Sequence, residues 1–145
     1  MSARVDPSDE GGTMLLWMLM VVMMVLFLGG ISLDLWRAFS ERRAVAGIVD
    51  AAAIAGASGI DEAAYRATNA VVLDPAEASA RAFASLGAQG EPVSSPVVTV
   101  AADGSAITVT ASRDVPFTLM RILLPDLGDA HIVASAASTP ILDPP

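Results

Sequence analysis

The strongest constraint on the fold of this chain is an uncharged segment close to its N-terminus. No residue from Gly11 to Leu33 carries a charge, and all residues from Met14 to Leu28 are apolar. As an α-helix, which rises about 1.5 Å per residue, this segment is about 35 Å long and can cross a hydrocarbon core of about 30 Å. A buried helix of a soluble protein would carry a polar stripe, which this segment lacks. The sequence therefore predicts a transmembrane helix over residues 11–33, with the lipid bilayer as its partner.

A cleaved signal peptide is the competing interpretation of this segment. Signal peptides combine a basic start with an apolar region of about 7–15 residues and a small-residue cleavage site close behind it. Here the apolar run is longer, and the leader at residues 1–10 carries Asp6, Asp9 and Glu10. A small-x-small pattern at Ala44–Ala46 lies too far beyond the run. We therefore expect an uncleaved anchor that follows a polar leader.

The composition narrows the chemistry of the part outside the membrane. The chain has no cysteine, which excludes disulfides and cysteine-based metal or redox sites. Its formal net charge is −8. An acidic surface argues against nucleic acid or anionic lipid as a partner of this part.

The helix is predicted to continue beyond the membrane. No proline or turn cluster interrupts the sequence before Gly56 and Gly59, so these glycines mark its expected end. Mostly small residues recur along this extension at steps of three, four or seven. They are Leu35, Phe39, Ala46, Val49, Ala53 and Gly56. Such spacing places a narrow seam on one side of a helix.

Two shorter helices are expected next. Asp61 is positioned to cap the first of them. Asp74 is a second N-cap candidate, because Pro75 suits the first position of a helix. This second helix should span residues 75–86, with Gly87 as its end. Its expected apolar face consists of Ala76, Ala80, Phe83 and Leu86 or positions next to them.

The C-terminal half shows the two-residue period of β-strands. Apolar residues alternate over 98–102 and over 107–111, on either side of the turn signal Asp103-Gly104. This arrangement predicts a β-hairpin. A third strand is expected over residues 131–138.

The segment between the second and third strands is apolar again. Phe117–Leu124 is expected to form a short helix or an irregular segment closed by Pro125, and Asp126, Gly128 and Asp129 are expected to form a turn. The whole pattern predicts an α+β fold. A long N-terminal helix, transmembrane and then extramembrane, precedes a small helix and an antiparallel β-hairpin or three-stranded sheet. The extramembrane domain should span 34–138, followed by a flexible tail at 139–145.

Candidate catalytic and metal-binding residues are few. His131 is the only histidine, and with Asp129 close by it fits a turn or strand edge better than a catalytic or metal site. Asp126 and Asp129 lack the spacing of a calcium-binding loop. No G-x-S-x-G motif occurs, and neither pair of consecutive glycines follows a strand or precedes a lysine, as phosphate-binding loops require. We therefore expect no enzyme activity, no cofactor and no metal.

The segment Gly29–Ala57 carries several motifs in a fixed order. They are Gly30 at the end of the apolar helix, Asp34, Arg37, the doublet Arg42-Arg43 and the sequence DAAAIAGA from Asp50. These residues resemble the N-terminal segment of the TadE/TadG-like family of the Flp, or tight-adherence (Tad), pilus system. The resemblance implies a single-pass minor pilin-like or assembly subunit of a bacterial pilus or related secretion machine. Its partners would be other pilus-assembly or pilin-like subunits.

One feature departs from the pattern of polymerising pilins. Pilin-like proteins of this kind are commonly cut after a glycine and carry glutamate at the fifth mature position. A cut after Gly12 would place Trp17 there, and a cut after Gly11 would place Leu16. The chain therefore resembles a minor or assembly component more than a major pilin.

The resemblance and the charge pattern predict opposite orientations in the membrane. The resemblance implies an inner-membrane anchor with a cytoplasmic N-terminus and an extracytoplasmic C-terminal domain. Arg37, Arg42 and Arg43 follow the apolar run, however, and the positive-inside tendency would keep them in the cytoplasm. We favour the orientation that the resemblance implies.

The extension of the long helix is the expected contact with other subunits. The predicted partner-binding residues are Arg42, Arg43, Ala46, Val49, Asp50, Ala53 and Gly56. Small side chains let a second helix approach closely, in a homo- or hetero-oligomer. The alternative is that the seam packs on the chain's own helix over 75–86. A membrane-anchored module that binds an extracellular ligand or surface would be a different class of function, and it would require a concave pocket in the β-containing half.

Overall fold

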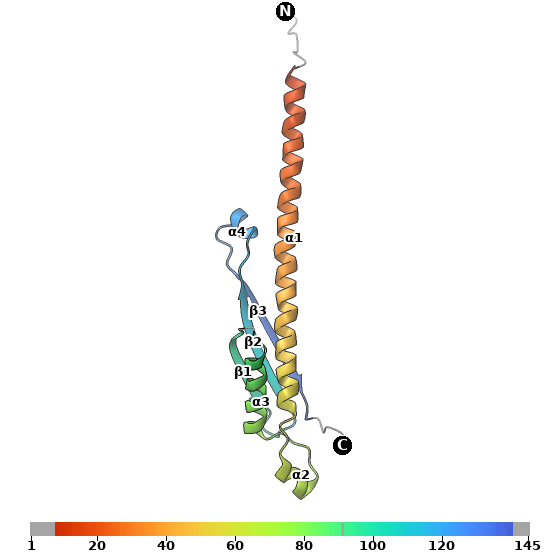
Figure 1. Cartoon of the computed structure of the whole chain (residues 1–145), viewed down its shortest axis with the longest axis vertical. Helices are drawn as coiled ribbons and strands as arrows, with labels where there is room; N and C mark the ends of the chain where they lie inside the picture. The colour runs from red at the N-terminus through yellow and green to blue at the C-terminus, as the bar shows by residue number, and fades with distance from the viewer. Residues whose placement is uncertain (1–7, 91, 141–145) are drawn as a thin grey trace, which may run out of the picture. The chain divides into compact units, whose positions relative to one another are not determined.

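The computed structural model describes residues 8–90 and 92–140. Its longest element is the N-terminal helix. Helix α1 runs without interruption from Ser8 to Ala57 (Figure 1). The prediction of one helix that continues past the apolar segment to Gly56 is therefore confirmed. Within the described residues, α1 is the one helix long and apolar enough to cross a membrane. The predicted leader and tail lie largely outside the described residues.

The chain divides into two compact units. The helix–loop unit combines α1 up to Arg37 with the loop Phe117–Gly128, and the sheet unit contains the remainder. The division therefore falls inside α1, four residues beyond the predicted end of the transmembrane segment. The remaining elements are α2 (Glu62–Thr68), α3 (Pro75–Ala88), β1 (Ser94–Val100), β2 (Ile107–Val115), α4 (Met120–Leu123) and β3 (Ala130–Ser138). Of these, only α4 belongs to the helix–loop unit.

Both predicted N-caps are confirmed. One carboxylate oxygen of Asp61 accepts hydrogen bonds from the backbone N–H groups of Ala63 and Ala64, each at 2.9 Å. Asp74 does the same at the start of α3, where Pro75 occupies the first helical position. These bonds satisfy donors that have no partner inside a helix, so local sequence is enough to fix where both helices begin.

The end and the buried face of α3 differ from the prediction. The helix continues through Gly87 to Ala88, and the left-handed residue that ends it is Gly90, at φ 68°. The face toward the core consists of Ala78, Ala82 and Leu86, whereas Ala76, Ala80 and Phe83 are exposed. Small side chains at 78 and 82 face the core because α1 approaches closely there.

Three antiparallel strands form a sheet in the order β1-β2-β3. The predicted hairpin is confirmed, since Val100 pairs with Ile107 across a loop that contains Asp103 and Gly104. The hydroxyl and backbone N–H of Ser105 donate to the Asp103 carboxylate at 2.7 and 3.0 Å. The third strand predicted over 131–138 is present as β3.

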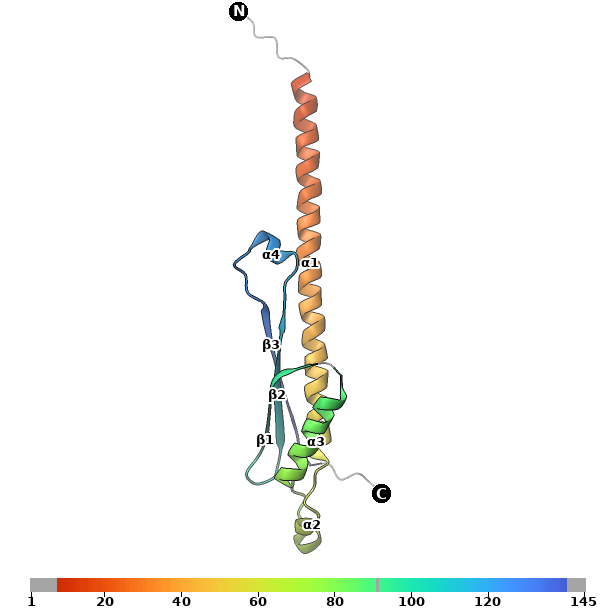
Figure 2. The same ribbon diagram turned by 60° about the vertical axis from the view of Figure 1, so that its left-hand side comes forward.

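The core of the sheet unit lies between the sheet and two helices. The later part of α1 and helix α3 cover the same face of the sheet (Figure 2). Fully or nearly fully buried side chains come from α1 (Val45, Ile48, Val49, Ala52, Ala53, Ala57), from α3 (Ala78, Ala82, Leu86) and from β2 (Ile107, Val109, Ala111). The expected α+β fold is confirmed.

Candidate functional site

The predicted partner-binding residues of α1 divide into buried and exposed positions. Val49, Ala53 and Gly56 are buried in the core of the sheet unit. A Cβ atom at Gly56 would lie 2.4 Å from Cδ1 of Ile107 and 3.0 Å from the carbonyl oxygen of Ala78. These three positions pack inside their own chain, as the alternative interpretation anticipated. At Gly56 the neighbours include Ile107 of strand β2 as well as α3, and the sequence analysis did not anticipate the contact with β2.

The other predicted positions remain on the surface. Arg42, Arg43, Ala46 and Asp50 are all exposed. Phe39 and Ile54, two large apolar residues, are also exposed. They lie on the same side of α1 as these four residues, because residues three and four apart share one side of a helix. The six residues Phe39, Arg42, Arg43, Ala46, Asp50 and Ile54 are called the outer face of α1 below. This face combines apolar side chains with two positive charges and one negative charge.

A partly buried ion pair ties α1 to the sheet within the sheet unit. Nη1 of Arg113 on β2 donates to Oε2 of Glu41 at 2.9 Å, and Nε of Arg113 donates to the carbonyl oxygen of Pro92 at 3.2 Å. The sequence analysis missed this pair, although Glu41 stands directly before the Arg42-Arg43 doublet. Glu41 is therefore engaged inside the chain, while the arginines beside it remain exposed.

In the helix–loop unit, the carboxylate of Asp34 organises the loop Phe117–Gly128. It accepts three backbone N–H groups, from Thr118 at 3.3 Å and from Leu119 and Met120 at 2.7 Å each. Asp34 is only 6% exposed. The Met120 N–H contributes most to holding the pKa of Asp34 below its ordinary value of 3.8, and the other two donors and Arg37 act in the same direction against the effect of burial.

The same loop packs its side chains on α1 one turn earlier. Gly30 is buried, and a Cβ atom there would lie 2.9 Å from Cδ1 of Leu119. Ile122 and Leu119 also line a small cavity of about 60 Å³ with Leu26, Phe27 and Gly30. Gly30 and Asp34, which the sequence analysis singled out only through the family resemblance, thus have a common role in seating this loop.

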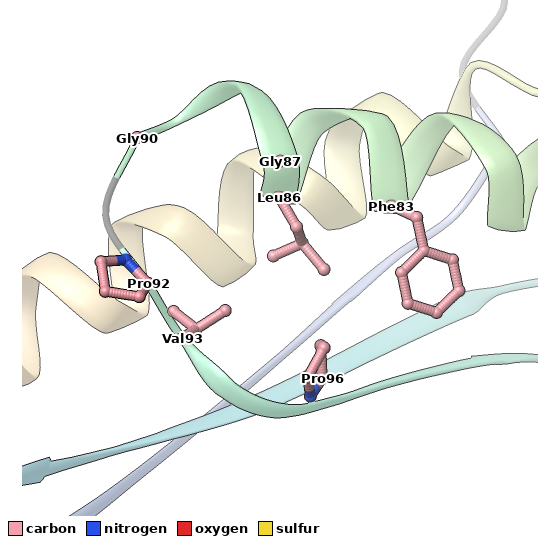
Figure 3. Close-up of a pocket in the computed structure, with 7 residues that line it drawn as sticks. All are labelled: Phe83, Leu86, Gly87, Gly90, Pro92, Val93 and Pro96. Atoms are coloured by element: carbon pink, nitrogen blue, oxygen red, sulfur yellow. The ribbon is translucent and has the colours of Figure 1, made fainter.

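A shallow apolar groove lies between α3 and the start of β1. Its volume is about 400 Å³. It is lined by Phe83, Leu86, Gly87, Gly90, Pro92, Val93 and Pro96, and the larger of these side chains converge on it (Figure 3). None of the lining residues carries a titratable side chain, so the groove offers apolar contact without acid–base groups.

His131, the one histidine considered for catalysis or metal binding, lies beside a carboxylate of the neighbouring strand. His131 lies on β3, an edge strand, and its Nδ1 lies 2.6 Å from Oδ1 of Asp114 on the neighbouring strand. Both side chains are more than half exposed. Among the residues that the structure describes, no group of three histidine or acidic side chains could hold a metal ion.

A signal for the loop contact was present in the sequence but is visible only in retrospect. Phe117–Leu124 is too apolar for a water-exposed connection between two strands, which ordinarily contains polar turn residues. Asp34 is the first charge after a long uncharged run. Neither feature shows that Asp34 and this loop contact each other.

A family model matches the N-terminal segment that carries Gly30 and Asp34. Residues 11–70 match the model of the family Tad, described as "Putative Flp pilus-assembly TadE/G-like". No curated protein and no solved structure matches the chain. The matched segment covers α1 from its uncharged part onward and all of α2. It includes Asp34, the Arg42-Arg43 doublet and the end of α1 at Ala57. The resemblance seen in the sequence is therefore confirmed, and this part of the chain is similar to the TadE/G-like pilus-assembly family.

Proposed function

We propose that the chain is a membrane-anchored minor pilin-like or assembly subunit of a Tad/Flp-type pilus or a related secretion machine. The match of residues 11–70 to the pilus-assembly family is the observation that carries this proposal. The exposed apolar stretch of α1 adds a physical reason for a membrane location. In water, side chains such as Met14, Leu19 and Leu26 would form a large apolar surface, which soluble monomers avoid.

The chain's mode of action would be mechanical. The uncharged part of α1 anchors the chain in the bilayer, and the outer face of α1 docks other pilus-assembly or pilin-like subunits. Exposure on one side of a rigid helix lets that face pack against a second helix. Phe39 and Ile54 supply apolar area, Ala46 permits close approach, and the charges at 42, 43 and 50 set register and partner choice.

The orientation that we propose places the C-terminal domain outside the cytoplasm, anchored in the inner membrane. This orientation rests on the family resemblance. Arg37 and the Arg42-Arg43 doublet oppose it through the positive-inside tendency.

A second candidate function is a membrane-anchored binding module for an extracellular ligand or surface. The apolar groove between α3 and β1 is the observation that favours it. Substitution of Phe83 and Pro96, which border the groove, distinguishes the two functions. Loss of ligand or surface binding with normal pilus assembly would favour the binding module.

The test of the proposed function is deletion and complementation in the organism that encodes the chain. Deletion should remove Tad-type surface filaments or secretion, and the wild-type gene should restore them. Arg43→Glu, on the outer face of α1, should restore them poorly at normal protein level. Arg66→Glu makes the same charge change on α2 and should restore them fully. Unchanged filaments and secretion after deletion would contradict the proposal.

A further inference from the structure

The loop Phe117–Gly128 exposes more apolar surface than a connection between two strands ordinarily does. Ile122 is 72% exposed, Leu124 is 54% exposed and Leu119 is 37% exposed. Contiguous exposed apolar side chains mark sites that contact a membrane or another protein. The loop therefore requires a covering surface.

The position of the loop along α1 indicates what that surface is. Leu119 lies against Gly30, and Ile122 lines a small cavity with Leu26 and Phe27. Leu26, Phe27 and Gly30 all belong to the uncharged segment that is expected to lie in the bilayer. The apolar side chains of the loop thus continue a surface that faces lipid.

The depth of this contact can be read from the helix rise. Gly30 and Phe27 precede Leu33, the end of the uncharged segment, by three and six residues. At about 1.5 Å per residue, they lie roughly 5 and 9 Å inside that end. Interfacial segments bury their apolar side chains by about 5–10 Å at the boundary between headgroups and acyl chains. Leu119 and Ile122, which contact these helix residues, therefore lie at the depth of an interfacial segment.

The backbone of the loop is suited to a site with little water. Non-helical backbone at membrane depth needs internal partners for its polar groups. Asp34 accepts the N–H groups of Thr118, Leu119 and Met120. The carbonyl oxygens of Leu119 and Met120 accept the N–H groups of Ile122 and Leu124, at 3.2 and 2.8 Å. A carboxylate just beyond the uncharged segment thus supplies acceptors that water would otherwise provide.

The two charged residues of the loop are compatible with this depth. Arg121 has a long aliphatic stem that lets its guanidinium group reach the headgroups while the stem stays in apolar surroundings. Asp126 stands after Pro125, in the turn that leaves the apolar stretch.

We propose that the loop Phe117–Gly128 inserts Leu119, Ile122 and Leu124 into the bilayer beside α1, so that the chain contacts lipid at two separate segments. Asp34 is the positioning residue that holds the loop at this depth. The occupant of the exposed surface is lipid, because the loop continues the lipid-facing surface of α1. The inference rests on the proposed membrane anchorage of α1.

Single-cysteine fluorescence tests the inference, since the chain contains no cysteine of its own. Leu26→Cys, Ile122→Cys and Ser105→Cys are labelled with an NBD fluorophore, and each full-length chain is reconstituted into phosphatidylcholine vesicles. Quenching by doxyl-labelled phosphatidylcholine reports contact with lipid. Quenching by iodide, present on both sides of the membrane, reports contact with water. Leu124→Cys serves as a second loop position in case the label at 122 disturbs the loop.

The expected result is strong lipid quenching and iodide protection at 26, 122 and 124, with the reverse at 105, in the hairpin loop. Adding Asp34→Ala should shift residue 122 toward iodide quenching without changing residue 26. Lipid quenching at 26 with iodide quenching at 122 and 124 would overturn the loop inference and leave the anchor intact. Protection of 122 and 124 from both quenchers would overturn it in favour of a protein partner. Absence of lipid quenching at 26 would overturn the membrane anchorage itself.

Discussion

The carboxylate of Asp34 and the backbone N–H of Leu119 lie 2.7 Å apart, although 85 residues separate them in the chain. The bond joins the first charged position after the uncharged segment to the loop between the last two strands. Substitution at Asp34 should therefore act on a distant segment of the sequence. Asp34→Ala should increase amide exchange at Leu119 and Met120 in the full chain in detergent micelles. Asp50→Ala removes an exposed carboxylate from the same helix and should leave those amides unchanged.

The same carboxylate should give the loop a dependence on pH. The pKa of Asp34 is lowered by backbone N–H donors, so the stabilisation that its charge provides is present above 3.8. It is lost as the pH falls through the lowered value. The amide proton shifts of Leu119 and Met120 should titrate with a midpoint below 3.8. A midpoint at or above 3.8 would show that the carboxylate does not hold these amides.

Two glycines of α1 should respond oppositely to the same substitution. Gly56→Ala places a methyl group 2.4 Å from Cδ1 of Ile107. Overpacking of this kind costs about 1–3 kcal/mol. Gly47→Ala meets no atom within 4 Å and should stabilise the helix by about 0.5–1 kcal/mol, because alanine loses less backbone entropy than glycine. Amide exchange of β2 in the full chain measures both effects. Equal stability of the two variants would mean that α1 does not pack on β2 at Gly56.

The orientation in the membrane can be decided at the tip of the hairpin. Ser105 is exposed and the wild-type chain has no cysteine, so Ser105→Cys gives a single thiol to label. An extracytoplasmic domain should react with a thiol reagent that cannot cross the inner membrane, applied to cells with a permeabilised outer membrane. Protection until the cells are lysed would place the domain in the cytoplasm, as the arginines after the apolar run suggest.

Local signals explain why the starts of the two short helices and the turn of the hairpin could be predicted from the sequence. Asp61 and Asp74 each cap one helix, and Asp103 holds the hairpin loop. In each case the carboxylate accepts hydrogen bonds from groups two or three residues away. The buried face of α1 could not be chosen in the same way. The spacing predicted a seam of small residues but not which surface covers it, because alanine and glycine also occur on the other sides of this part of the helix. Contact between Gly56 and Ile107, far apart in the sequence, decides which side is buried.

The candidate site was predictable only in part for the same reason. Arg42, Arg43, Ala46 and Asp50 remain on the surface, where a partner can reach them, whereas Val49, Ala53 and Gly56 are buried in the core. The spacing alone therefore did not separate the buried positions from the exposed ones. The family resemblance singled out Asp34 but did not give its contact, because that contact requires the loop before β3 to fold back on α1.

Photo-crosslinking at Ala46 tests the account's central claim, that the outer face of α1 docks another subunit. Ala46 is replaced by p-benzoylphenylalanine in cells that assemble the machine, and Ala67, an exposed alanine on α2, serves as the matched control. Irradiation should yield a discrete adduct at position 46 with another Tad-type subunit, or with a second copy of this chain, and none at position 67. Absence of any protein adduct at 46, with the chain present at normal level in the membrane, would contradict the account.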